Sequence, residues 1–283
     1  MLIDTQIHPA LYKEVYHDDA LFKRRCDEMN FHQMKPTDLA ILKQQYALAE
    51  MKHAVLLGQD CSAGKEEPLI SNEDLQTIVT AAPDFFVGFA SVDPRDERAP
   101  EKLVHAFEHL QLSGFTVNTA KLKMYPADPR LISLYKICRR YCKPIIFHAG
   151  LSLENHTAAK YAHPMEFEEV ADDFPDIKIC LAHLGWPWVN ETAALLIKYP
   201  NLYANTAVMC MDSPRLLFEK IFYQDMGRYW LDHNLADKIM FGSDSPRIRP
   251  VRCKRGLDSL EMEPETRYKL YYANAAQFLG LKE

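Results

Sequence analysis

Eight short apolar runs recur along the chain, and longer, more polar stretches separate them. Most of the runs are nearly continuous in β-branched and aromatic residues, which is typical of strands buried on both faces in a parallel sheet. The pattern therefore predicts eight parallel strands. They lie at 2–8, 53–59, 85–92, 115–125, 144–150, 177–185, 201–207 and 238–244.

The stretches between the runs carry helix signals. Segment 36–53 keeps an apolar stripe at helical spacing, and Ser71 with Asp74 has the pattern of a capping box. Proline stands just inside three more predicted helix starts, at Pro129, Pro214 and Pro264.

Strands that alternate with helices over 283 residues predict an α/β fold, a single-domain (β/α)8 TIM barrel spanning residues 1–283. A doubly wound open sheet is the structural alternative. It is disfavoured because segment 56–67 has the spacing of neither glycine-rich phosphate loop. The irregular stretches 11–35 and 151–165 follow the first and fifth strands, so both are candidate lids over the active face.

Composition narrows the class of protein. Hydrophobic residues make up 48% and charged residues 25%, and the net charge of −6 does not favour a nucleic-acid partner. No apolar run reaches the length of about 18 residues that a membrane span needs. The chain enters a strand at once, without a signal peptide, and its seven cysteines are scattered. We therefore expect a cytoplasmic protein with reduced thiols that acts on a small molecule.

Ionisable side chains stand where the predicted strands end. The carboxyl ends of all strands meet at the active face of such a barrel. Three histidines and one aspartate lie at four of these ends: His8, His148, His183 and Asp244. Imidazole and carboxylate are ligands that a divalent metal such as zinc prefers. A single strand histidine is more often a buried structural group, but four such side chains at one end of the barrel predict a metal site.

The fourth run ends in two lysines, Lys121 and Lys123. They are either solvated or ion-paired residues at the end of a strand, or they bind substrate anions.

Several motifs together resemble those of a known family. They are "IDTQIHP", "IIFHAG", "AHLGWPW", "NLYANTA", "FGSDSP" and the final "NAAQFLGL". In this order they are similar to the amidohydrolase-related proteins, the branch of the amidohydrolase superfamily that includes proteins like aminocarboxymuconate semialdehyde decarboxylase. The similarity covers essentially the whole chain.

The resemblance implies a (β/α)8 barrel with one divalent metal, usually zinc, with manganese as the alternative. Its ligands would be His8, His148 and Asp244, while His183 would either join them or position water and substrate. The resemblance also suggests a homodimer.

Gln6 departs from the family pattern, because relatives carry histidine or glutamate at that position. Two residues before His8, its side chain would leave the strand on the same face. A neutral amide oxygen is a weaker zinc ligand than imidazole or carboxylate. We expect Gln6 to point to the same centre and to bind the metal weakly or through water.

The main functional prediction is a hydrolase that acts on a small carboxylate-bearing amide, ester or lactone. Metal-bound water would be activated, with Asp244 as the base and His183 stabilising the oxyanion or protonating the leaving group. Lys123 and Arg247 would bind the substrate carboxylate, and Trp186 would form an apolar wall.

Two alternatives remain open. In a metal-dependent decarboxylase of a small aromatic or unsaturated acid, Asp244 or His183 would protonate the carbon that loses CO2. The other alternative is a metal-free lactonase or a non-catalytic protein that binds a small carboxylate.

Overall fold

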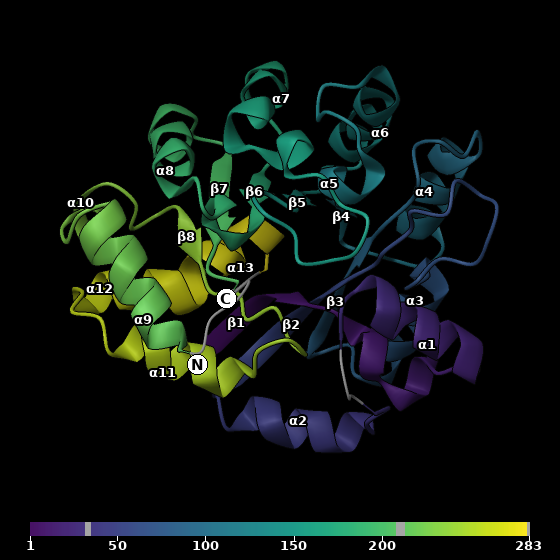
Figure 1. Ribbon diagram of the computed structural model, residues 1–283, viewed down its shortest axis with the longest axis horizontal. Helices are drawn as coiled ribbons and strands as arrows, with labels where there is room; N and C mark the ends of the chain where they lie inside the picture. The colour runs from purple at the N-terminus through teal and green to yellow at the C-terminus, as the bar shows by residue number, and fades with distance from the viewer. Residues whose placement is uncertain (32–34, 208–212, 282–283) are drawn as a thin grey trace.

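The computed structural model describes residues 1–31, 35–207 and 213–281 and confirms the predicted barrel. Eight parallel strands lie side by side in chain order at the centre, and helices surround them (Figure 1). The strands are β1 (Leu2–Ile7), β2 (Met51–Leu57), β3 (Phe86–Ala90), β4 (Gly114–Val117), β5 (Ile145–Phe147), β6 (Ile179–Leu181), β7 (Leu202–Asn205) and β8 (Ile239–Met240).

The helices follow the strands around the ring. They are α1 (Asp19–Glu28), α2 (Leu39–Ala47), α3 (Asn72–Ala81), α4 (Ala99–Glu108), α5 (Thr119–Leu122), α6 (Pro129–Arg140), α7 (Glu168–Asp173), α8 (Val189–Lys198), α9 (Pro214–Glu219), α10 (Trp230–His233), α11 (Pro250–Asp258), α12 (Pro264–Tyr268) and α13 (Asn274–Leu279). Short 3-10 turns cover Pro9–Leu11, Lys13–Val15, Ala159–Ala162, Pro164–Phe167 and Ala182–Gly185, and π-helical turns cover Lys220–Asp225 and Lys269–Ala273.

The predicted helix starts are confirmed. Ser71 and Asp74 form the capping box of α3, and each of the three prolines is the first residue of its helix. The helix predicted over 36–53 ends earlier, at Ala47. Glu50 then turns the chain in a left-handed conformation (φ 59°), and β2 begins at Met51.

The fourth strand is shorter than its apolar run predicted. It ends at Val117, and the side chain of Asn118 accepts a hydrogen bond from the backbone N–H of Lys121 at 3.0 Å, which starts α5. Lys121 and Lys123 therefore lie in and after a short helix rather than at the end of a strand.

The barrel closes between β1 and the segment after β8. The backbone N–H of His8 donates to the carbonyl of Ser245 at 2.8 Å, and that of Asp244 donates to the carbonyl of Gln6 at 3.1 Å. These bonds join the carboxyl ends of the two strands, which are far apart in the sequence. Residues 6–8 and 244–247 are consequently held side by side.

Apolar side chains fill the barrel and the layer between strands and helices. Inside the barrel, Phe89 stacks on Phe278 of α13, with ring centroids 6.4 Å apart. Because Gln277 of α13 accepts a hydrogen bond from Lys178, just before β6, this helix covers the amino-terminal end of the barrel. At the carboxyl end of the barrel, polar side chains such as His148 and Asp244 line a cavity.

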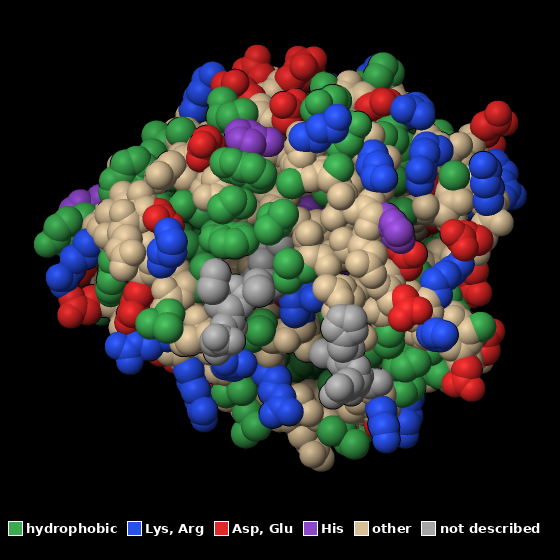
Figure 2. All heavy atoms as spheres, viewed as in Figure 1, with side chains coloured by type: hydrophobic (Ala, Val, Ile, Leu, Met, Phe, Trp, Pro, Cys, Tyr) green, Lys and Arg blue, Asp and Glu red, His purple; other side chains and the backbone are tan. Residues whose placement is uncertain are grey.

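The face viewed in Figure 2 carries Lys and Arg side chains interspersed with Asp and Glu. No helix in the described ranges has the length and apolar character needed to cross a membrane. The six cysteines that the structure describes are free thiols, and Cys210 lies outside the described residues.

Candidate active site

A cavity lies at the carboxyl ends of the strands. Six of the predicted site residues line it: Gln6, His8, His148, His183, Asp244 and Arg247. Further polar wall residues are Gln59, Ser91, Thr116, Asn118, Ser152 and Glu154, and apolar ones include Met29, Leu57, Val117, Ile146 and Leu153.

The carboxylate of Asp244 is surrounded by hydrogen-bond donors. Its Oδ1 accepts a hydrogen bond from Gln6 Nε2 at 3.1 Å and lies 3.3 Å from His8 Nε2, while Oδ2 accepts one from Arg247 Nε at 3.1 Å. Burial alone would raise the pKa of Asp244, but the hydrogen bond from His8 and the nearby positive charges hold it well below its usual range. A carboxylate held in this way is a weak proton acceptor.

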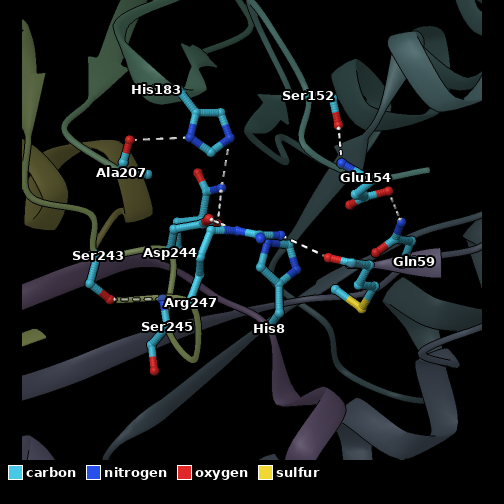
Figure 3. A network of polar contacts seen from close by, with 12 residues as sticks. His8, Gln59, Ser152, Glu154, His183, Ala207, Ser243, Asp244, Ser245 and Arg247 are labelled. Atoms are coloured by element: carbon cyan, nitrogen blue, oxygen red, sulfur yellow. Dashed lines mark hydrogen bonds and ion pairs between the residues drawn. The ribbon is translucent and has the colours of Figure 1, made fainter. Parts of the chain in front are cut away.

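The His183 ring is held by contacts on two sides, and Figure 3 shows one of its nitrogens directed at the carbonyl of Ala207. Its Nδ1 lies 3.2 Å from the carbonyl oxygen of Ala207, which can only accept, so Nδ1 carries the proton and Nε2 presents a lone pair. That lone pair faces Gln6 Nε2 at 3.1 Å. Burial lowers the pKa of His183 to about 4, so the ring is neutral near neutral pH.

The orientation of the Gln6 amide follows from its neighbours. Asn205 Oδ1 accepts hydrogen bonds from the backbone N–H groups of His183 (3.0 Å) and Ala207 (3.3 Å), so its Nδ2 faces Gln6 and donates to Gln6 Oε1 at 3.0 Å. Gln6 therefore turns its nitrogen toward Asp244 and His183. Its side chain points to the expected centre, but an amide N–H₂ group donates and cannot bind a cation. The oxygen that could bind a metal is engaged by Asn205, so the expected role of Gln6 as a weak metal ligand stays a prediction.

The site contains atoms that can bind a divalent metal, but these atoms are not arranged around a common point where an ion could lie. His8 Nε2 and Asp244 Oδ1 are 3.3 Å apart, which is close to the spacing of about 3.4 Å between two ligands of one tetrahedral ion. Within the described ranges, however, no three His, Cys, Asp or Glu side chains form a group that could hold a metal. An ion would have to displace the Gln6 amide and compete with Arg247 for Asp244. The residues as they stand do not fit the expected zinc or manganese ion, so the ligand roles stay predictions.

His148 contributes an unused polar atom. The ring follows β5 and lies beside His183, with centroids 4.8 Å apart. Burial and the neighbouring His183 hold its pKa well below the usual range. Its Nε2 is buried and makes no hydrogen bond to any residue that the structure describes. A substrate group, a water molecule or an ion could bind there.

Glu154 and Gln59 were not predicted as site residues. Gln59 follows β2 and donates from Nε2 to Glu154 Oε2 at 2.7 Å, and both line the cavity. Removal of the carboxyl group from water raises the pKa of Glu154. The polar end of the second run, "LLGQD", was the available signal for Gln59, whereas Glu154 lies in a candidate lid whose path cannot be read from the sequence.

Two predicted substrate-binding residues lie outside this cavity. Lys123 lines a neighbouring hollow together with Arg24 and Lys121, because α5 turns residues 121–123 away from the strand direction. Trp186 lines a smaller cavity that it shares with His183 and Phe218. The structure does not place either residue where a molecule bound beside Asp244 would touch it.

Known proteins are similar to this chain over different lengths. The protein fluG of Emericella nidulans is 26% identical over 118 residues, which are 40% of this chain and 13% of fluG. The chain thus spans only a small part of that relative.

Solved structures match nearly the whole chain. An uncharacterised TIM-barrel protein of Bordetella bronchiseptica has 22% identity and a TM-score of 0.76, covering 99% of this chain and 98% of its own. The 5-carboxyvanillate decarboxylase LigW of Sphingomonas paucimobilis has 16% identity and a TM-score of 0.67, covering 99% of both chains. A dihydroxybenzoic acid decarboxylase of Polaromonas sp. JS666 has 15% identity and a TM-score of 0.65, covering 100% and 97%, and its structure contains manganese and the inhibitor 2-nitroresorcinol.

These likenesses establish the TIM-barrel fold, and two of the similar proteins are decarboxylases. The family model described as "Amidohydrolase" matches residues 3–281, almost the entire chain. The chain therefore belongs to the amidohydrolase family.

Proposed function

We propose that the protein removes CO2, without redox chemistry, from a small aromatic or unsaturated carboxylic acid. The observation that carries this proposal is the state of Asp244. Hydrolysis through activated water, the main prediction from the sequence, assigned Asp244 as the base. A carboxylate that already accepts hydrogen bonds from Gln6, His8 and Arg247 is poorly suited to that task.

Decarboxylation makes different demands, which the cavity meets better. It needs a cation for the substrate carboxylate, an apolar surface for the rest of the molecule, and a proton donor. The activity of the two similar decarboxylases, LigW and the Polaromonas enzyme, supports the same choice.

Arg247 is the cation that would hold the substrate carboxylate. Its Nε donates to Asp244 and its Nη2 donates to the carbonyl of Met29 at 2.9 Å. Its Nη1 makes no hydrogen bond within the described ranges and is free to donate to a substrate oxygen. The guanidinium also lies over the ring of Phe31, with 5.0 Å from its central carbon to the ring centroid, which fixes its plane. Leu57, Ile146 and other apolar wall residues would contact the ring or alkene.

We assign no step to a metal ion. Zinc or manganese at His8, His148 and Asp244 would supply a positive centre for the carboxylate, but Asp244 Oδ1 already accepts a hydrogen bond from the Gln6 amide, which also contacts His183 Nε2. The reaction is therefore described through the protein's own side chains.

Hydrolysis remains a second candidate because of one atom. His148 Nε2 faces no protein partner within the described part of the chain, so it could accept a hydrogen bond from a water molecule and hold it in the cavity. This route positions the water through His148 and not through Asp244.

A paired substrate panel distinguishes the candidates. Hydroxylated benzoates and unsaturated acids would be assayed for CO2 release, and lactones, esters and amides for hydrolysis, each with a chelator and with added manganese or zinc. We expect CO2 release with the chelator present and loss of that activity in Asp244→Asn. Asp237→Asn is the matched control, because Asp237 precedes β8 at the opposite end of the barrel and its side chain is 71% exposed. Hydrolysis without CO2 release would refute the proposal.

A further inference from the structure

Decarboxylation leaves a carbon atom that must receive a proton, and few groups in the cavity wall can supply one. The acids to consider are the two carboxyl groups, the three histidines and the Cys61 thiol. Arg247 cannot serve, because a guanidinium does not lose its proton in proteins.

Asp244 and His183, the two proton donors that the sequence favoured, are both held in hydrogen bonds that prevent them from giving a proton to the substrate. Asp244 is an ionised carboxylate that accepts hydrogen bonds on both oxygens, so it has no proton to give. His183 carries its single proton on Nδ1, which points to the carbonyl of Ala207 and away from the cavity, while Nε2 accepts from Gln6.

The remaining histidines and the thiol are no better placed. His8 directs its Nε2 at Asp244, and its other ring nitrogen is buried. His148 is neutral, and a neutral imidazole is a very weak acid. Burial raises the pKa of Cys61 well above its ordinary value, so this thiol does not give up its proton readily.

Glu154 is the remaining acid, and its geometry suits the task. Gln59 Nε2 donates to Oε2 at 2.7 Å, whereas Oε1 makes no hydrogen bond to a described residue and can carry a proton. Figure 3 shows Glu154 and Gln59 on one side of the site and Asp244, Arg247 and His8 on the other. A small acid held by Arg247 would lie between the two sides.

The loop that carries Glu154 is tied to the first candidate lid. The N–H of Asn155 donates to the carbonyl of Glu28 at 3.0 Å, and Asn30 Nδ2 donates to the carbonyl of Leu153 at 3.1 Å. Lys121 Nζ adds a bond to the carbonyl of Asn155 at 2.6 Å. Bonds on both sides of residue 154 hold its carboxyl group in the cavity wall.

From this arrangement we infer that Glu154 is a catalytic residue of the proposed decarboxylation, donating a proton from Oε1 to the carbon that loses CO2. The inference rests on the proposed function. It replaces the earlier assignment of this step to Asp244 or His183.

The step balances without any further reactant. The ring carbon that bears the carboxylate uses a π-electron pair to bind the proton of Glu154, which becomes a carboxylate. The bond from that carbon to the carboxylate then breaks, its electron pair restores the double bond of the ring, and CO2 leaves. Glu154 takes a new proton from water. The ring must be electron-rich, so the substrate class is a hydroxylated or aminated aromatic acid.

The pH dependence follows from the groups that face Glu154. His8, Lys121 and Arg247, from three separate elements, and the hydrogen bond from Gln59 all lower its pKa, but removal of the carboxyl group from water raises it more. The protonated form is the active one. The kcat should therefore fall as the pH rises through the raised pKa of Glu154.

The test compares Glu154→Gln, Glu154→Asp and the wild type on an acid from the panel that loses CO2. We expect Glu154→Gln to lose at least about 100-fold in kcat, the usual contribution of a positioned acid. Its remaining activity should no longer fall across the pH range in which the wild type falls, and Glu154→Asp should recover part of kcat. Binding of 2-nitroresorcinol, followed by its absorbance, should change by less than about threefold, because that probe accepts no proton at carbon.

Glu166→Gln is the matched control, since Glu166 directly follows the same candidate lid, is exposed and does not line the cavity. If the wild type releases CO2 and Glu154→Gln keeps its kcat and pH profile, the assignment of Glu154 alone is wrong. If Glu154→Gln loses probe binding in parallel with kcat, the residue binds substrate and is not the donor. If the wild type releases CO2 from no acid, the proposed function fails and this role fails with it.

Discussion

Replacing Gln6 by glutamate tests whether an amide has taken the place of a cation in this site. In the wild type, Gln6 Nε2 donates to Asp244 Oδ1 and to His183 Nε2, both at 3.1 Å. Gln6→Glu keeps the shape but puts a carboxylate oxygen where the donor was. Two carboxylates then face each other, and together with His8 and His148 they form the kind of ligand set that divalent metals prefer.

The loss of stability in Gln6→Glu follows from the distance between the side chain at position 6 and Asp244 Oδ1. Two full charges 3.1 Å apart repel by about 5 kcal/mol at an effective dielectric constant of about 20, and the pair reduces this by binding a proton. We therefore expect Gln6→Glu to lose roughly 2–5 kcal/mol of unfolding free energy without metal. A metal at about 100 times its Kd would return about 2.7 kcal/mol. For a chain of this size that corresponds to a rise in Tm of about 5 °C.

Thermal unfolding with a chelator, and then with added manganese or zinc, measures both effects. The wild type should gain little from metal, and Gln6→Glu should gain the predicted amount. Gln44→Glu, an exposed change of the same kind in α2, should behave like the wild type. If metal raises the Tm of the wild type as much as that of Gln6→Glu, the amide does not exclude the ion and this reasoning is refuted.

Three further changes follow from the same contacts. Asp244→Asn removes the charge between His8 and Arg247 and should cost about 3–5 kcal/mol of unfolding free energy, measured by denaturant titration. It should also lower kcat, because Arg247 loses the carboxylate that positions it. His183 has a folded pKa of about 4, below the unfolded value of 6.5, so its stabilising contribution is complete above pH 6.5 and is lost as the pH falls toward 4. The difference in unfolding free energy between the wild type and His183→Asn should change by roughly 3 kcal/mol across that window, and an unchanged difference would show that the ring is not buried as a neutral group. Arg247→Lys should raise KM for a carboxylate substrate about tenfold or more with a smaller change in kcat, because lysine lacks the planar fork that reaches Asp244, Met29 and the substrate together, and an unchanged KM would remove Arg247 from substrate binding.

The barrel could be predicted because each signal was local. Continuous apolar runs indicate strands buried on both faces, and Ser71 or Pro129 marks a helix start from a few residues. The convergence of His8, His148, His183 and Asp244 needed only the rule that the strands of a barrel end at one face.

The finer geometry could not be predicted, because it depends on contacts between distant residues. The Gln6 amide is oriented by Asn205, which is 199 positions away, and Asn205 is itself oriented by two backbone N–H groups. Glu154 reaches the cavity because α1 and α5 hold its loop. Lys123 was misplaced because one side-chain cap at Asn118 turned a predicted strand into a helix.

The hydrogen bonds that close the barrel between β1 and the segment after β8 explain how the residue at position 6 can change the chemistry of the site without moving the backbone. Asp4 is fully buried and accepts hydrogen bonds from the backbone N–H groups of Gln6 (3.1 Å) and Ser243 (3.0 Å). These bonds join the Asp4 carboxylate to backbone N–H groups of β1 and of the segment after β8, and they do not depend on the side chain at position 6. The Cα positions of Gln6 and Asp244 are therefore set by the fold, and the side chain at position 6 decides whether a donor or an acceptor faces Asp244. An amide there holds Asp244 and His183 together by hydrogen bonds, whereas a histidine or glutamate would leave the same groups in need of a cation.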